Sequence, residues 1–148
     1  MTLKEGLMDD LREAIHHGDV VRKNVIRMVR AAVANAEIEW QRPATDDEIL
    51  ALINKEIRTS QESLAFFAQG NRQDLVAEEE AKIAILEQYL PEQLTDKEVT
   101  QAVQQVIVDL AANGLGSLGP VMREAMASLK GRADGHRVNQ IARELLGE

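Results

Sequence analysis

The segment "YLPEQLT", residues 89–95, divides this sequence into two parts of different composition. Pro91 cannot lie in a helix interior, because it has no backbone N–H and its ring clashes with the preceding turn. The aromatic residues Trp40, Phe66, Phe67 and Tyr89 all lie in the first ninety residues, whereas most of the glycines follow the segment. We therefore place a domain boundary here, with an N-terminal helical domain at 1–90 and a C-terminal domain at 95–148.

Helix start and stop signals recur on both sides of this boundary. Capping-box sequences, in which a Thr and a Glu satisfy each other's backbone N–H, stand at 2–5, 45–48 and 95–98. Gly18, Gly70, Gly114 and Gly131 follow apolar runs of helical period, where a left-handed residue often ends a helix. No segment shows the alternation of apolar and polar residues that is typical of a β-strand. The predicted helices are about 2–17, 19–40, 45–69, 72–89, 96–113, 118–130 and 136–146. The expected fold is all-α, with an N-terminal four-helix, bundle-like part followed by a small C-terminal three-helix unit.

The overall composition excludes several classes of protein. The absence of cysteine excludes disulfides, thiolate metal sites and a cysteine nucleophile. The sequence has neither a secretory signal nor an apolar run long enough to span a membrane. We therefore expect a cytoplasmic protein that does not associate with membranes. The net charge of −8 argues against nucleic acid binding over the whole surface, because such binding depends on neutralising phosphates.

Positive charge is nevertheless concentrated in two islands. The first lies in residues 20–36, which contain four basic residues and no acid. Lys23, Arg27 and Arg30 stand at positions i, i+4 and i+7 and share one helix face, opposite the apolar stripe. This face is either an ordinary solvated surface or a surface that binds a protein partner, and the sequence leaves both interpretations open.

The second island is "LKGRADGHRVNQ", residues 129–140. Gly131 ends one predicted helix, and Asp134 is placed to cap the next. A helix N-terminus offers free N–H groups and positive potential to an anion, and Lys130, Arg132 and Arg137 would surround such an anion. The alternative is that the segment is only a compact turn between two helices.

No set of residues typical of catalysis, metal binding or cofactor binding is evident. His16 and His17 are adjacent, so their side chains point about 100° apart on a helix and do not readily share one metal ion. The glycines of "GLGSLGP", residues 114–120, follow a predicted helix, whereas a nucleotide-binding loop follows a strand. We expect no metal, no cofactor and no catalytic residue, and hence no enzyme activity of the chain by itself.

Several segments carry a resemblance to a known family. These are "NVIRMVRAAVANAEIE" at 24–39, "YLPEQL" at 89–94, "GPVM" at 119–122 and "LKGRADG" at 129–135. Together they resemble the GatB/YqeY-type family, and in particular a free-standing YqeY-like protein, in the same order along nearly the whole chain. The resemblance implies an all-helical fold in two parts.

The resemblance also implies a function. In larger relatives this module is the C-terminal tail of the B subunit of the tRNA-dependent amidotransferase, a carbon–nitrogen ligase, and the tail contacts tRNA while the chemistry lies elsewhere. It implies a non-catalytic, tRNA-binding or tRNA-associated accessory module, and we expect the chain to be a monomer. The implied RNA- or anion-binding residues are Lys130, Arg132, Arg137, Asn139 and Arg143. One alternative is a protein-interaction module that docks on an amidotransferase or aminoacyl-tRNA synthetase through Lys23, Arg27 and Arg30. Another is a subunit with glutamine-dependent carbon–nitrogen ligase activity only in a complex.

Overall fold

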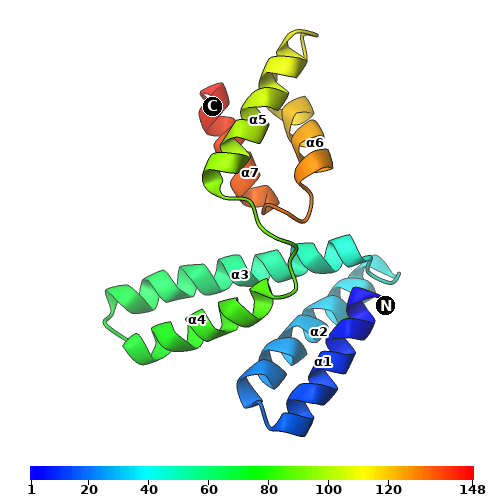
Figure 1. The fold of residues 1–148 in the computed structure, drawn as a ribbon, viewed down its shortest axis with the longest axis vertical. Coiled ribbons are helices and arrows are strands. Elements are labelled where there is room, and N and C mark those ends of the chain that lie inside the picture. The colour runs from blue at the N-terminus through cyan, green and yellow to red at the C-terminus, as the bar shows by residue number, and fades with distance from the viewer. The chain divides into compact units, whose positions relative to one another are not determined.

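The computed structural model describes residues 1–148 and contains seven helices and no strand (Figure 1). The helices are α1 (Leu3–His17), α2 (Val20–Trp40), α3 (Asp46–Gln69), α4 (Gln73–Glu87), α5 (Asp96–Ala111), α6 (Leu118–Leu129) and α7 (Gly135–Leu146). The expectation of an all-α chain is confirmed, and the predicted helix ends differ from the observed ones by no more than two residues. None of the helices combines the length and the apolarity that crossing a bilayer requires.

The three predicted capping boxes are present at the starts of α1, α3 and α5. At α3, for example, the Thr45 hydroxyl accepts from the Glu48 N–H at 3.2 Å, and the Glu48 carboxylate accepts from the Thr45 N–H at 3.0 Å. Each box satisfies two backbone donors that a helix start otherwise leaves without partners. These local bonds explain why the starts of the three helices were predictable.

Not all of the predicted helix ends have the expected geometry. Gly18 and Gly131 have φ of 67° and 78°, the left-handed conformation that the sequence predicted for them. The same prediction is wrong for Gly70, whose φ is −87°. The left-handed position lies one residue later, at Asn71 with φ of 55°. Asparagine tolerates this conformation because its short polar side chain forms local hydrogen bonds. The left-handed residue that ends α3 is therefore Asn71 and not the preceding glycine.

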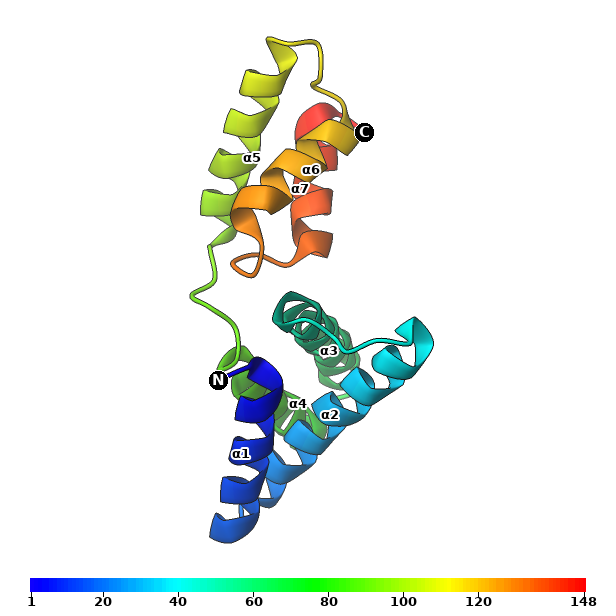
Figure 2. The ribbon, with the colours of Figure 1, turned by 90° about the vertical axis from the view of Figure 1, so that its right-hand side faces the viewer.

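Contacts between helices divide the chain into two compact units, and the first is Met1–Leu90. Helix α1 packs against α2 and α3 packs against α4, as two helical hairpins, and α2 contacts both helices of the second hairpin (Figures 1 and 2). The buried core is entirely aliphatic and consists of Leu7, Leu11, Val25, Ile26, Val29, Val33, Ile49, Ile53, Ile57, Ile85 and Leu86. These residues come from all four helices, so burial of their apolar surface holds the two hairpins together.

The second unit is Pro91–Glu148, in which α5, α6 and α7 each pack against the other two. Its core consists of Val99, Val103, Val121, Ala125, Leu129, Ala133, Val138, Ile141 and Ala142. The segment before α5 is bonded to the turn between α6 and α7. The Leu94 N–H donates to the Arg132 carbonyl at 2.9 Å, and the Gln93 side-chain amide donates to the Gly131 carbonyl at 2.8 Å. These two bonds fix the shape of the turn that carries the second basic island.

Candidate nucleic-acid interface

The turn between α6 and α7 is closed by the chain's own groups. Helix α6 ends at Leu129, whose side chain is buried, and Gly131 makes the left-handed step that starts the turn. Asp134 then caps α7, because its carboxylate accepts from the His136 N–H at 3.3 Å. The start of α7, where the sequence placed an anion, therefore already holds a carboxylate.

Arg137 lies in the first turn of α7 and is also engaged by an acid. Its guanidinium donates to both carboxylate oxygens of Asp96, at 3.2 Å from Nε and 2.9 Å from Nη2, and to the Gln140 amide oxygen at 3.3 Å. These bonds from Arg137 hold the pKa of Asp96 below its ordinary value, and the same pair raises the pKa of the guanidinium. Asp96 fills the Nε and Nη2 edge of the guanidinium and Gln140 accepts from Nη1, so a phosphate that binds Arg137 competes with acceptors that are already present.

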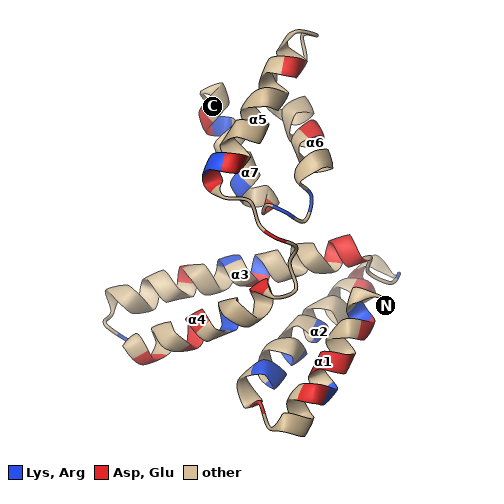
Figure 3. Cartoon of the chain, in the orientation of Figure 1, with Lys and Arg blue, Asp and Glu red and all other residues tan.

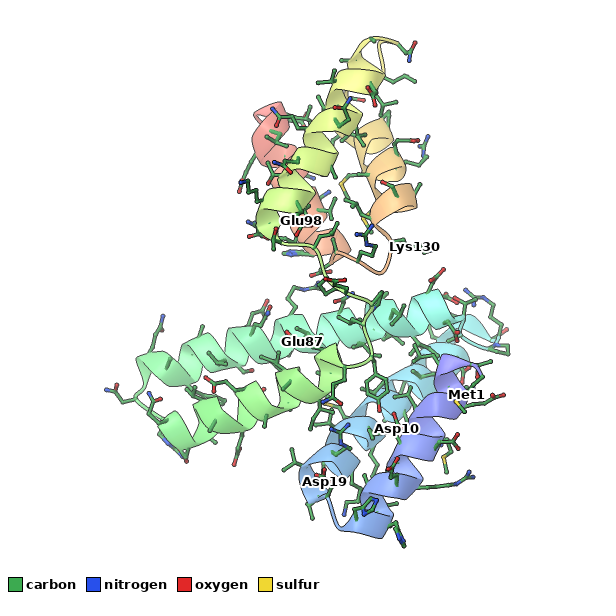
Figure 4. All side chains as sticks on the ribbon, viewed as in Figure 1. Met1, Asp10, Asp19, Glu87, Glu98 and Lys130 are labelled. Carbon is green, nitrogen blue, oxygen red and sulfur yellow. The ribbon has the colours of Figure 1, made fainter.

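Lys130 and Arg132 lie on the turn itself, and both side chains are exposed. Figure 4 labels Lys130 on this turn and Glu98 on α5. The pKa of Glu98 is lowered, mainly because its carboxylate accepts from the Thr95 N–H and hydroxyl, with a smaller contribution from the charge of Arg132. The turn therefore presents two basic side chains to solvent close to a capping glutamate.

Asn139 and Arg143 are not part of this group. Arg143 Nε donates to the Asn139 side-chain oxygen at 2.9 Å, one helical turn away on α7. Asn139 follows Arg137 by two positions, which corresponds to about 200° of rotation around the helix. The structure thus brings Lys130, Arg132 and Arg137 to the end of the unit where α6 meets α7, and places Asn139 and Arg143 on a different face.

The first basic island has different surroundings. Arg27 and Arg30 are exposed on α2 and Lys23 is partly exposed, and none of the three makes an ion pair or a side-chain hydrogen bond. Helix α2 carries several bands of Lys and Arg, whereas α1 beside it carries several bands of Asp and Glu (Figure 3). Arg22 differs from the three, because it donates to the Gln88 amide oxygen at 2.9 Å and lies 3.6 Å from Asp19.

Sequence reasoning missed a polar hollow in the first unit. It has a volume of about 400 Å³ and is lined by Asp10, Glu13, Ala14, His17, Asp19, Arg22 and Gln88. Figure 4 labels Asp10 and Asp19 on the hairpin of α1 and α2, and Gln88, which follows α4, completes the lining. The neighbouring Tyr89 hydroxyl donates to the Asp10 carboxylate at 2.6 Å, and burial together with this bond raises the pKa of Tyr89 above its usual range. No local signal in the sequence joins residues near 10 to residues near 89, so packing alone reveals this contact.

The chain has no group of three or more His, Asp or Glu side chains arranged to hold a metal ion. Asp10 accepts from Tyr89, and Asp19 caps α2 by accepting from the Arg22 N–H at 3.0 Å. His17 lies 3.8 Å from Glu13 on the same helix. The polar side chains of the hollow thus have structural partners within the first unit, and the basic surfaces are the better candidates for binding.

Comparison with known proteins identifies the family. The family model described as "Yqey-like protein" matches residues 4–146. The chain belongs to the YqeY-like family. The resemblance inferred from "YLPEQL" and the 129–135 segment is therefore confirmed.

Several curated relatives match this YqeY-like chain. Altered inheritance of mitochondria protein 41, mitochondrial, of Pyrenophora tritici-repentis is 33% identical over 144 residues, which are 95% of this chain and 79% of that protein. The protein of the same name in Kluyveromyces lactis is 35% identical over 108 residues, 70% of this chain and 58% of that protein. A glutamyl-tRNA(Gln) amidotransferase component from Thermococcus gammatolerans is 39% identical over 59 residues, 40% of this chain but only 9% of that protein.

These comparisons correct one expectation. The cytoplasmic location predicted from the sequence is wrong, because the fungal relatives of this YqeY-like chain are named as mitochondrial proteins. The prediction rested on the absence of cysteine and of a secretory signal. Neither feature separates the cytoplasm from the interior of another compartment that keeps thiols reduced, so neither indicates the cytoplasm.

Proposed function

We propose that this YqeY-like protein is a non-catalytic, tRNA-associated accessory module. The observation that carries the proposal is the basic turn between α6 and α7, whose shape is fixed by the bonds from Gln93 and Leu94. The match to a component of a glutamyl-tRNA(Gln) amidotransferase supports tRNA as the nucleic acid. In this role the chain contributes affinity for RNA, and any amide chemistry belongs to a partner protein.

The turn binds phosphate through charge. Lys130 and Arg132 contribute exposed positive charges, and Arg137 contributes a guanidinium for which the phosphate competes with Asp96. About three phosphate contacts give a slope of roughly −2 to −3 when the logarithm of the binding constant is plotted against the logarithm of salt concentration. Such binding is weak, and a net charge of −8 opposes RNA binding over the acidic parts of the surface.

We also propose that the two compact units are the domains expected from the sequence. Residues 1–90 then form a bundle-like helical domain and residues 95–148 a three-helix domain, in a monomeric chain. Their separate aliphatic cores support this division, because each core is built from the helices of one unit only. The proposed RNA-binding turn belongs to the smaller domain.

Titration of unfractionated tRNA tests the proposed function. The turn variant Lys130→Glu/Arg132→Glu/Arg137→Glu is compared with the dispersed variant Arg12→Glu/Lys55→Glu/Arg72→Glu, which changes net charge equally at three exposed sites of the first unit. We expect the turn variant to bind more weakly than the dispersed variant, with a shallower salt dependence and unchanged helicity. Equal binding by the two variants contradicts a role for this turn.

A further inference from the structure

The three cations of α2, Lys23, Arg27 and Arg30, are here called the α2 stripe. None of the three makes an ion pair. Arg12, Arg42, Arg72 and Arg137 each lie within 4 Å of an acid. The positive charge of the stripe is therefore less compensated than that of the paired arginines.

The rest of this helix face suits a polyanion. At 100° per residue, exposed Asn24, Ala31, Ala34 and Asn35 fall in the same arc of about 140° as the stripe. The amides add hydrogen-bonding groups, and the alanines are small enough to let a polymer approach the helix closely. The face contains no acid between residues 20 and 36.

The nearest acid that follows on α2 is already occupied. The Glu37 carboxylate pairs with Lys4 at 2.8 Å and accepts from the Ala44 N–H at 2.9 Å, and the Lys4 bond is the main reason that its pKa is lowered. Glu37 therefore has its own partners and does not neutralise the stripe by direct pairing. From Lys23 to Asn35 the face is about 18 Å long, at 1.5 Å per residue.

We propose that the α2 stripe binds the phosphate backbone of RNA and contributes more affinity than the turn between α6 and α7. This inference rests on the proposed tRNA association. The sequence did not decide whether this face is an ordinary solvated surface or a surface that binds a protein partner. A protein interface is expected to have large apolar or aromatic anchors at its centre. Here Arg27 is central, and the large exposed apolar side chains within the arc of the stripe, Val20 and Ile38, lie at its ends.

The test adds two stripe variants to the tRNA titration, at about 50 mM and about 200 mM salt. In the stripe variant, Lys23→Glu/Arg27→Glu/Arg30→Glu, we expect an affinity at least about tenfold lower than in the dispersed variant, with a salt slope reduced by roughly 2 to 3. The neutral variant Lys23→Gln/Arg27→Gln/Arg30→Gln removes the charges without adding acids. It should reduce the slope similarly with a smaller loss of affinity, and its helicity and thermal midpoint check that the fold is retained.

The outcomes separate this inference from the proposed function. If the stripe variant loses binding and the turn variant does not, the stripe is the RNA-binding surface and the assignment of the turn fails. If the turn variant loses binding while the stripe variant matches the dispersed variant, the inference is overturned, and the stripe is left to a protein partner or to solvent. If the unaltered chain does not bind tRNA at about 50 mM salt, both proposals are overturned.

Discussion

The α2 stripe and the turn between α6 and α7 carry similar formal charge in different surroundings. On the turn, Arg137 is held by both oxygens of Asp96, and Asp134 caps the adjacent helix. On α2, the three cations have no acidic partner. The number of basic residues in a segment therefore does not measure its capacity to bind anions. An acid from a distant segment can form an ion pair with an arginine of the basic segment, and that arginine is then less available to an anionic ligand.

The largest effect is expected from loss of packing in the core of the second unit, which supports the turn. Leu129→Ala deletes a buried side chain of the second core and should cost about 2–5 kcal/mol. Because the unit is small, we expect faster amide hydrogen exchange throughout α5, α6 and α7, with little change in α2. Leu7→Ala in the first core is the matched variant and should show the converse. Equal acceleration in both units would contradict their independence and with it the separation of the two basic surfaces.

A smaller effect is expected from the backbone of the turn. Gly131 has φ of 78°, so Gly131→Ala should cost roughly 1–2 kcal/mol, because a Cβ is unfavourable in the left-handed region. Gly6→Ala, in the interior of α1 where the new Cβ meets only Met1 Sδ at 3.8 Å, should be neutral or stabilising. Chemical denaturation measures both. If Gly131→Ala is as stable as the unaltered chain, the geometry of the turn is not set by this residue.

The occupation of Arg137 can be tested directly. Asp96→Asn removes the negative charge that pairs with Arg137 and keeps the guanidinium. We therefore expect tRNA affinity to rise about two- to fivefold, which is the range typical of one exposed ion pair. Asp109→Asn is the control, because it changes net charge equally at an exposed site of the same helix, where Asp109 accepts from Gln105. A rise of the same size in both variants would mean that only net charge matters.

The smallest expected effect is a change in the pKa of one exposed carboxyl group, that of Asp96. Because the pKa of Asp96 in the folded chain lies below its ordinary 3.8, the pair with Arg137 stabilises the fold above that pH, and this contribution is lost as the pH falls through the lowered value. Arg137→Gln should bring the pKa of Asp96 back toward 3.8. NMR titration of the side-chain carboxyl measures the change. The pKa of Glu98 should move little, because its main partner is Thr95. If the pKa of Asp96 does not respond, the ion pair does not form in solution.

The local parts of the fold were predictable from the sequence and the long-range contacts were not. A threonine followed three residues later by a glutamate predicted the starts of α1, α3 and α5, because a capping box forms within one helical turn. Pro91 lies between α4 and α5, as expected of a residue that cannot stand in a helix interior.

The contacts of the candidate sites depend on packing between helices. Asp96 reaches Arg137 across 41 positions, and Asp10 reaches Tyr89 across 79. No local pattern encodes which acid meets which base or hydroxyl. The sequence therefore predicted that Lys130, Arg132 and Arg137 lie near one turn, but it could not predict that Arg137 would be occupied or that Lys23, Arg27 and Arg30 would not.

The distribution of aromatic side chains gives the molecule a reporter of its own. Trp40 is the single tryptophan and the last residue of α2, with the Arg42 guanidinium 5.1 Å from the centre of its ring. No aromatic residue follows Tyr89, so the second unit is silent in intrinsic fluorescence. Emission from Trp40 therefore follows unfolding of the first unit alone, whereas circular dichroism follows both. A gap between the two unfolding curves would measure, without any label, how independently the two units melt.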